Sequence, residues 1–287
     1  MTYHFIQDHR DEFDLEIMLR VLEVSRSGFY DWRGRPNNTQ DRADQELSKS
    51  IEDIHAASRG RYGAPRVHAE LCSRGQRCSR KRVARLIRAR GLHGKTRRRF
   101  KHTTDSKHRL PVAENKLERD FSAQKPNQKW LADITYLPTS EGFLYLAVVL
   151  DVFSRRVEGW SIQDSLETKL VLEALTMARG LRRPEAGLVF HSDRGVQYAS
   201  VEFRQALSRL EAVQSMSRKG NCWDNAPCES FFATLKLELD FDGALRSKAV
   251  TRGLVFEYVE VFYNRVRRHS SLGFVSPAQV EALKLEA

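Results

Sequence analysis

The sequence lacks long apolar runs. No stretch of 18 apolar residues occurs among its 287 residues, so no helix is expected to cross a membrane. The amino-terminal MTYHFIQDHRDEFD lacks the basic, apolar and small-residue segments of a signal peptide. These two absences predict a soluble, cytoplasmic protein.

Cysteine is also scarce. The four cysteines fall into two pairs with five residues between the members of each pair: Cys72 and Cys78, then Cys222 and Cys228. This spacing matches neither a short zinc knuckle nor the dense disulfide framework of a secreted domain. A mixed zinc site with His55 and His68 is an alternative that their irregular spacing disfavours. We therefore expect reduced, mostly structural thiols.

Acidic residues are nearly missing from residues 74–109. This segment holds eleven arginines and four lysines against one acid, Asp105, so it carries +14 while the whole chain carries +11. The remainder of the chain therefore sums to −3. A uniformly solvated basic surface would not concentrate charge in this way, whereas a phosphate-binding element would. The distribution predicts that the protein binds nucleic acid.

The amino-terminal third of the chain shows helical patterns. Residues 14–33 are typical of two short helices, with Ser25 as the N-cap of the second. The polar, turn-rich residues 33–42 predict a boundary near residues 35–42. We therefore assign residues 1–40 to a helix-turn-helix-like region and residues 45–95 to a helix-turn-helix DNA-binding domain.

Three helical patterns make up that second domain, over residues 48–58, 64–75 and 79–91. Ser79 can cap the third helix and Gly91 can end it. Its apolar spacing predicts one buried face formed by Val83, Leu86, Ile87 and Arg90. The remaining basic side chains would face DNA as on a recognition helix: Arg80, Lys81, Arg82, Arg85 and Arg88. A merely solvated basic helix is the alternative.

Residues 96–124 are predicted to form a basic linker. The run LHGKTRRRFKHTTDSKHRL, which overlaps its start, has no apolar period, and it would act as a flexible arm that follows a phosphate backbone. Arg97, Arg98 and Arg99 are its candidate DNA contacts.

From residue 125 the pattern changes to strands and helices of ordinary charge. Apolar, β-branched and aromatic stretches at 129–139 and 143–154 predict a hairpin, and 156–162 predicts a third strand. Helices and strands alternate afterwards, at 167–180, 188–193, 201–210 and 212–217, then in a helix opening at Asn225 and a long helix over about 247–269. This order predicts an α/β fold with a mixed sheet covered by helices.

Three carboxylates come from separate elements of that fold. Asp133 lies inside an apolar strand, where a carboxylate is costly to bury. Asp193 ends a buried strand, where α/β folds place their sites. Glu229 begins a helix, and Lys236 lies on the same helix face seven residues later. Glu229 could simply complement the helix dipole. If the three acids converge, however, their repulsion favours a pair of Mg²⁺ or Mn²⁺ ions about 4 Å apart, as used in phosphoryl transfer.

Several motifs carry a family resemblance. LADITYL, HSDRGVQYAS and GNCWDNAPCESFFATLK resemble the integrase core of bacterial insertion-sequence transposases, specifically the second-frame (orfB-type) product with a retroviral-integrase-like DDE core. Asp193 and Glu229 have 35 residues between them, which is the spacing in that family. The resemblance extends to RYGAPRVHAELCSRG, VSRSGFYDW and YNRVRRHSSLGFVSPAQV, so it covers nearly the whole chain.

The resemblance implies an RNase H-like catalytic core over residues 125–287, with Asp133, Asp193 and Glu229 as its metal-binding catalytic triad. It implies that Lys236 contacts DNA near the reacting end. The implied partners are the terminal inverted repeats of the element, target DNA, further copies of the chain and an upstream-frame product. The implied location is the bacterial nucleoid. No zinc is carried over, because helix-turn-helix patterns replace the histidine-cysteine domain of the retroviral relatives.

These observations predict a DNA transposase that nicks and joins strands at the ends of its own element with divalent metal ions. Two alternatives stay open. One is a simple metal nuclease of the same fold, and the other is a DNA-binding regulator left by a decayed element, which the presence of all three acids disfavours.

Other polar residues have less certain roles. Asp151 could be a spare metal ligand, but a structural hydrogen-bonding role is preferred. His191 could touch the site or DNA, or could simply pack. We expect Asn225 to be a helix cap rather than a ligand. Four residues near residue 265 suggest a helix end whose basic charge suits DNA or a partner: Tyr263, Asn264, Arg267 and His269.

Overall fold

The structure is a computed structural model that describes residues 2–34, 39–95, 110–218, 222–241 and 243–285. These residues belong to two compact units, Met1–Gly94 and Lys95–Ala287, and each is described by itself. Among the described residues, no helix has both the length and the apolar character needed to cross a membrane.

The chain begins with three short helices, α1 (Thr2–Asp8), α2 (Leu15–Val21) and α3 (Arg26–Gly34). The predicted cap at Ser25 is confirmed, because its Oγ accepts the Gly28 N–H at 3.0 Å. Helix α1 was not predicted from the sequence. It buries Ile6 in one apolar cluster with Phe29, and this long-range packing stabilises a helix whose own sequence carries little local signal.

Three further helices form the rest of the first unit: α4 (Thr39–Ala57), α5 (Ala64–Ser73) and α6 (Arg80–Ala89). Both predicted ends of the third are confirmed. Ser79 Oγ accepts the Arg82 N–H at 3.2 Å, and Gly91 takes a left-handed φ of 64° just beyond the last turn.

The predicted buried face of α6 is correct except at its end. Val83, Leu86 and Ile87 are buried. Arg90, however, is exposed and pairs with Glu52 at 2.9 Å. The guanidinium has five donors, and burying them without partners would be costly, so it stays at the surface.

The second unit is built on a five-stranded sheet with the order β3-β2-β1-β4-β5. Its strands are β1 (Lys129–Thr139), β2 (Gly142–Asp151), β3 (Val157–Gln163), β4 (Val189–Ser192) and β5 (Val213–Met216). The first three pair antiparallel, whereas β1–β4 and β4–β5 pair parallel. The predicted hairpin and mixed sheet are therefore confirmed. Ala132 of β1 lies opposite Ser192 of β4, so Asp133 and Asp193 follow equivalent positions on neighbouring strands.

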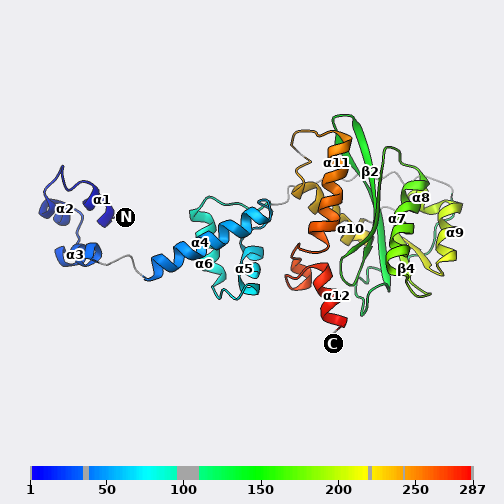
Figure 1. Cartoon of the computed structure of the whole chain (residues 1–287), viewed down its shortest axis with the longest axis horizontal. Helices are drawn as coiled ribbons and strands as arrows, with labels where there is room; N and C mark the ends of the chain where they lie inside the picture. Colours follow the sequence, from blue (N-terminus) through cyan, green and yellow to red (C-terminus); the bar gives the residue numbers. More distant parts are fainter. Residues whose placement is uncertain (1, 35–38, 96–109, 219–221, 242, 286–287) are drawn as a thin grey trace. The chain divides into compact units, whose positions relative to one another are not determined.

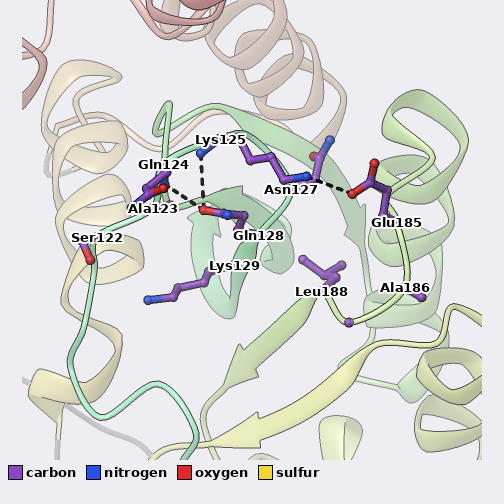
Figure 2. Close-up of a pocket in the computed structure, with 11 residues that line it drawn as sticks. Ser122, Ala123, Gln124, Lys125, Asn127, Gln128, Lys129, Glu185, Ala186 and Leu188 are labelled. Carbon is purple, nitrogen blue, oxygen red and sulfur yellow. Dashed lines mark hydrogen bonds and ion pairs between the residues drawn. The ribbon is translucent and has the colours of Figure 1, made fainter.

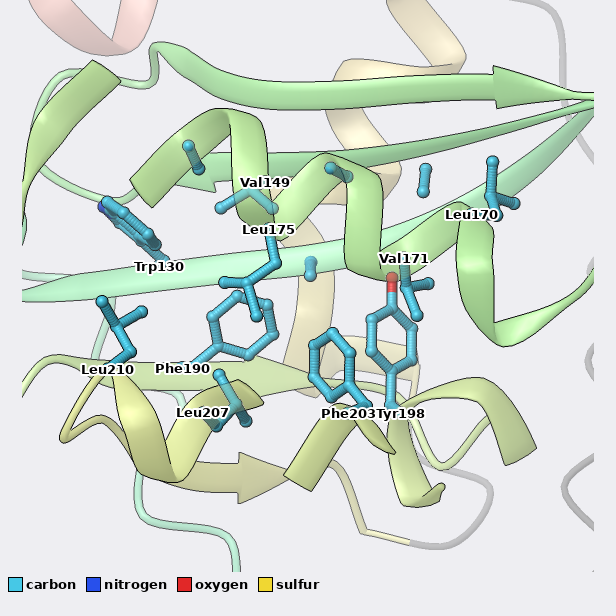
Figure 3. Close-up of a cluster of buried hydrophobic side chains, with 14 of the residues drawn as sticks. Trp130, Val149, Leu170, Val171, Leu175, Phe190, Tyr198, Phe203, Leu207 and Leu210 are labelled. Carbon is cyan, nitrogen blue, oxygen red and sulfur yellow. The ribbon is translucent and has the colours of Figure 1, made fainter. Parts of the chain in front are cut away.

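Helices cover both faces of this sheet (Figure 1). Helices α7 (Thr168–Arg182), α8 (Val196–Ala199) and α9 (Val201–Arg209) lie on one face, and α10 (Ala226–Glu238) and α11 (Lys248–Phe256) lie on the other. Figure 3 shows the core on the α7 side, where Trp130 and Phe190 from the sheet meet Leu175 and Phe203. A Cβ at Gly159 would lie 2.1 Å from the Ala174 carbonyl oxygen, so glycine lets α7 approach β3 closely.

The long helix predicted over residues 247–269 is interrupted, so that prediction is wrong in detail. Helix α11 continues into wider π-helical turns, η2 (Glu257–Tyr263), and the chain then forms a short 3₁₀ turn, η3 (Ser270–Leu272), and a separate helix, α12 (Pro277–Leu285). Just after the π turns, the Asn264 side chain accepts the Val157 N–H at 2.9 Å and donates to the Val157 carbonyl at 3.0 Å. These bonds to β3 draw the backbone inward, and helical periodicity alone does not reveal them.

Residues 110–124 pack against β5. Leu117 is only 1% exposed, and Ser215 Oγ accepts the backbone N–H groups of Lys116 at 2.8 Å and Leu117 at 3.3 Å. The carboxyl-terminal half of the segment that we assigned to a linker therefore contributes to the second unit.

Candidate active site

Asp133 lies on the face of β1 opposite the α7 core. Its neighbours Ala132 and Ile134 pack into that core, and side chains alternate along a strand, so Asp133 points toward α10, which packs against β1. Asp133 is half-buried, and its Oδ1 accepts the Ile134 N–H at 2.8 Å.

The pKa of the Asp133 carboxyl depends on burial and on its charged neighbours. Burial raises the pKa of its carboxyl, and the negative charges of Asp193 and Glu229 raise the pKa further, whereas the Ile134 hydrogen bond and the Lys236 ammonium lower it. The net pKa lies well above the usual range. Three carboxylates and one ammonium therefore influence one another at this point of the fold.

Asp193 directly follows β4 and is half-buried. Its Oδ1 accepts the Gly195 N–H at 2.9 Å, which closes a tight Asx-type turn. The next side chain, Arg194, donates from Nε to the Ser217 carbonyl at 2.6 Å. These bonds fix the chain direction after the strand, and with it the position of the Asp193 carboxylate.

Glu229 lies in the first turn of α10, two residues after Pro227. Phe231 and Phe232 are buried, and the Phe231 ring meets Tyr263 edge to face at 4.7 Å between centroids. The phenylalanines therefore anchor the helix in the core, while Glu229 stays half-buried.

Asn225 occupies the N-cap position of α10, as expected, but its side chain makes no cap hydrogen bond to the helix. Its Nδ2 instead donates at 3.0 Å to the carbonyl oxygen of Ala132, the residue before Asp133. Its buried Oδ1 has no hydrogen-bond partner among the described residues. The amide reaches across to the strand rather than back to its own helix, and it ties the start of α10 to β1.

Asp224 fixes the approach to the same helix. Its fully buried carboxylate accepts hydrogen bonds from Arg218 Nη2, Arg119 Nε and Asn115 Nδ2, each at 3.0 Å. The bond from Arg218 is the main reason that the pKa of Asp224 lies far below its usual range. Asp224 therefore stays ionised and holds three chain segments together.

Tyr198 was not singled out from the sequence. It is almost fully buried, and its hydroxyl has no hydrogen-bond partner among the described residues. Burial raises the pKa of this phenol, and the charges of Asp133 and Asp193 raise it further. The hydroxyl therefore lies near the acids. The only signal in the sequence is its place in HSDRGVQYAS, five residues after Asp193.

Asp151 and His191 have structural roles. Asp151 accepts the backbone N–H groups of Asn127, Phe153 and Ser154 at 2.7, 2.7 and 3.1 Å, which confirms the preferred interpretation. Buried His191 lies 2.8 and 3.1 Å from the hydroxyls of Ser215 and Ser217. Burial lowers its pKa to about 4, so the ring is neutral and packs between β4 and β5.

The four residues singled out near residue 265 do not form a basic surface for DNA or a partner. Tyr263, Asn264, Arg267 and His269 are all buried, which corrects the interpretation from the sequence. Arg267 pairs with buried Glu238 at 2.9 Å. This segment therefore holds α10 in place.

The basic side chains of α6 fall into two groups. Arg80, Lys81 and Arg88 are exposed. Arg82 and Arg85 instead bind the Asp44 carboxylate at 2.6 and 2.5 Å, and these bonds, that of Arg85 first, lower the pKa of Asp44. Arg97, Arg98 and Arg99 lie outside the described residues.

A cavity of about 620 Å³ lies elsewhere, at the amino ends of β1 and β4 (Figure 2). Lys129 and Leu188 line it, and Lys125 pairs with Glu185 at 2.9 Å across its rim. Asp193 follows the other end of β4, so this cavity is separate from the acids.

Comparison with known families defines the class of protein. An integrase core domain matches residues 123–222, a second integrase core model matches residues 211–277, and an HTH-like domain matches residues 42–100. The expected α/β integrase core, preceded by a helix-turn-helix-like region, is thereby confirmed. This architecture defines a DDE-type polynucleotidyl transferase with an HTH-like domain.

Full-length relatives define the family. The chain is 44% identical over 283 residues to transposase InsF for insertion sequence IS3A of Escherichia coli K12, covering 98% of each chain. It is 42% identical over 261 residues to an insertion element IS600 31 kDa protein of Shigella sonnei, covering 91% of this chain and 96% of the relative. The chain belongs to the family of IS3-type insertion-sequence transposases.

Solved structures show weaker similarity. A simian T-cell lymphotropic virus intasome in complex with a PP2A regulatory subunit matches with a TM-score of 0.47 and 16% identity, covering 80% of this chain and 74% of that one. The magnesium-bound HTLV-2 integrase catalytic core domain matches with a TM-score of 0.43 and 18% identity, covering 56% and 99%.

Proposed function

We propose that this transposase cleaves DNA at the ends of its own insertion sequence and joins the freed ends to target DNA, with Asp133, Asp193 and Glu229 as catalytic metal ligands. One observation carries this proposal. Burial raises the pKa of half-buried Asp133 on β1, and two further half-buried carboxylates, Asp193 at the end of β4 and Glu229 in the first turn of α10, raise it further. Such mutual repulsion between carboxylates at a partly open position is typical of a functional site.

The donor set fits Mg²⁺ or Mn²⁺. Carboxylates are the hard oxygen ligands that these ions prefer, and among the described residues the cation that lowers the pKa of Asp133 is Lys236. The buried Asn225 Oδ1, beside β1, offers a further oxygen with no hydrogen-bond partner among the described residues. Within those residues, no three His, Cys, Asp or Glu side chains form a ready metal site. We therefore expect the carboxylates to change rotamer when two ions bind.

The bound ions would activate the attacking water or 3′ hydroxyl and stabilise the leaving oxygen. The protein supplies position and charge. The phenylalanine-anchored α10 and the β-sheet hold the acids on rigid elements, and Asn225 links those elements. Lys236, seven residues after Glu229 on the same helix, would contact a phosphate near the reacting end.

DNA would be held largely by the first unit. Arg80, Lys81 and Arg88 would contact phosphates directly, whereas Arg82 and Arg85 share Asp44 and would have to contact DNA while bound to it. Arg97, Arg98 and Arg99 would follow the backbone. The proposed partners are the terminal inverted repeats, target DNA, further copies of the chain and the upstream-frame product, and the place of action is the nucleoid.

Isosteric replacements test the triad. Asp133→Asn, Asp193→Asn and Glu229→Gln should each abolish nicking and joining of labelled element ends in Mg²⁺, because each removes metal charge without adding volume. DNA binding should stay nearly intact. Glu202→Gln is the matched control, since Glu202 lies in the first turn of α9, and it should keep full activity. Any triad variant with substantial joining removes that residue from the site, and cleavage by the wild type without joining would favour a nuclease.

A further inference from the structure

Two exposed aromatic rings lie side by side on the β1–β2 hairpin. Tyr136 is 44% exposed and Phe143 is 52% exposed. Their ring centroids are 5.6 Å apart, with the rings nearly perpendicular at 80°. Large apolar side chains grouped at a surface usually mark a binding site.

The rings lie near the proposed active site but on the other face of the sheet, because Tyr136 is an odd number of residues from Asp133 on β1. The Lys236 ammonium is 4.9 Å from the Tyr136 ring centroid, while its charge also acts on Asp133. Strand β4 pairs with β1 only as far as Ala132, so the β1 edge beyond it has no strand partner on that side among the described residues. Lys236 reaches Tyr136 from α10 at this open edge.

The distance from acid to aromatic residue along β1 is nearly the same as the distance from acid to lysine along α10. Tyr136 follows Asp133 by three residues on β1, about 10 Å, and Lys236 follows Glu229 by seven residues on α10, about 10.5 Å. Along the backbone of their elements, Tyr136 therefore lies about 10 Å from Asp133 and Lys236 about 10 Å from Glu229. Stacked DNA rises about 3.4 Å per nucleotide along one strand, so this distance corresponds to about three nucleotides.

A flat apolar ring with an adjacent cation fits a nucleobase and its phosphate. Every base has a face that can stack on an aromatic side chain, and stacking is tolerant of sequence. The faces of a paired base inside a duplex are covered by its neighbours, so the occupant must be unpaired. A protein partner fits less well, because lysine is depleted from the cores of protein interfaces.

We infer that Tyr136 and Phe143 form a stacking platform for one unpaired nucleobase of the element end, within about three nucleotides of the scissile phosphate. Lys236 contacts a phosphate next to that base. The end must therefore fray before cleavage, and stacking on the rings offsets the cost of unpairing. This inference rests on the proposed function only in placing the scissile phosphate at the acids.

A thermodynamic cycle tests the platform. The full chain, with Asp193→Asn to stop turnover, is titrated in Mg²⁺ with end duplexes that carry one abasic site at each terminal position in turn. Tyr136→Leu should weaken binding of the intact end about 5- to 150-fold. An abasic site at one or two positions should cause a similar loss. The two losses should not multiply, because both remove the same stacking contact.

Two control variants and one substitute variant accompany the cycle. Tyr136→Phe keeps the ring and should behave as the parent. Phe256→Leu removes a ring of similar exposure, 55%, on α11, and its effect should be independent of every abasic position. If Tyr136→Leu lowers the melting temperature, Phe143→Leu supplies the same cycle from the more exposed ring.

Losses that multiply at every abasic position overturn the platform. A change in oligomeric mass on Tyr136→Leu, with no position-specific coupling, also overturns it and assigns the rings to a protein contact. If the catalytic proposal is wrong, the result is different. The Asp193→Asn protein will then still cleave the element ends, and the binding cycle will still measure the contribution of Tyr136.

Discussion

At the residue scale, Asn225 links the two elements that carry Asp133 and Glu229. Its amide joins the strand that carries Asp133 to the helix that carries Glu229, through the 3.0 Å bond to the Ala132 carbonyl. A buried carbonyl left without a donor costs about 1–3 kcal/mol. The side chain therefore stabilises the same backbone that positions the acids.

Asn225→Asp should remove this donor and place a fourth negative charge beside the acids. We expect a loss of about 1–3 kcal/mol of unfolding free energy at pH 7. Lowering the pH should recover part of it, because a protonated carboxyl can again donate to the Ala132 carbonyl. Millimolar Mn²⁺ should recover it as well. Urea unfolding with and without Mn²⁺ measures both effects.

Asn264→Asp is the matched control for that measurement. Asn264 makes the same kind of bond, from its Nδ2 to the Val157 carbonyl at 3.0 Å, and is equally buried. It should lose stability without recovery by Mn²⁺. Equal recovery of both variants would separate Asn225 from the metal site.

At the scale of elements, helix α6 divides its basic residues between DNA and its own domain. Changing Arg80, Lys81 and Arg88 together to Ala should weaken DNA binding and reduce the slope of log affinity against log salt by about 0.9 for each lost phosphate contact. The melting temperature should stay unchanged. Filter binding over a salt series measures the slope, and exposed Arg209 on α9, changed to Ala, is the control.

Arg82→Ala should behave differently from the triple variant. It leaves the half-buried Asp44 carboxylate with one guanidinium instead of two, so the domain should be destabilised. An unchanged salt slope in the triple variant would assign the exposed face of α6 to solvent.

Helix α12 is joined to the sheet by a shared arginine. Glu281 of α12 binds Arg182 at 2.9 Å, and Arg182 also lies 3.3 Å from Glu158, which is only 1% exposed. Burial outweighs the two nearby guanidiniums and raises the pKa of Glu158 to about 8. Glu158 therefore keeps its proton at neutral pH.

This proton predicts a fall in stability as the pH rises. Between its ordinary pKa of 4.5 and about 8, the folded state holds a proton that the unfolded state has lost. Unfolding free energy should therefore decline across this range, by up to about 5 kcal/mol. Glu158→Gln should remove the decline. Denaturant unfolding at pH 5.5 and 8 tests it, and parallel pH profiles for the two proteins would contradict the assignment.

At the scale of the whole molecule, the second unit should fold without the first. A fragment of residues 110–287 keeps Leu117 buried and keeps the Asn115 and Arg119 bonds to Asp224. It should unfold cooperatively and bind Mn²⁺. A fragment that starts at Lys125 loses these contacts and should be several kcal/mol less stable. Circular dichroism melts compare the two, and equal stability would make residues 110–124 dispensable.

The same fragment tests the division of labour between the units. Residues 110–287 contain all three acids but neither α6 nor Arg97, Arg98 and Arg99. The fragment should keep weak activity on preformed nicked or branched DNA and lose preference for element ends. Assays on end-containing and scrambled duplexes at fixed salt decide this. Retained end preference would place recognition inside the catalytic unit, and the proposed domain limits would need revision.

The sequence by itself determined much of this protein. Apolar, β-branched and aromatic stretches within residues 129–162 predicted the antiparallel strands, and Ser25, Ser79 and Gly91 marked helix ends correctly. These features depend on neighbours within a few residues. The motifs around Asp133, Asp193 and Glu229 indicated the transposase family, because chemistry restricts which residues can stand there.

Tertiary structure alone decided where the other polar side chains find partners. Asn225 was predicted to cap its own helix, but its side chain binds Ala132, which lies 93 residues away along the chain. Arg82 and Arg85 were assigned to DNA, but both bind Asp44. Arg267 and His269 were assigned to a basic helix end suited to DNA or a partner, but both are buried. A polar side chain can bond to any complementary group that folding brings near it, so local spacing predicts the element that carries the side chain and not its partner.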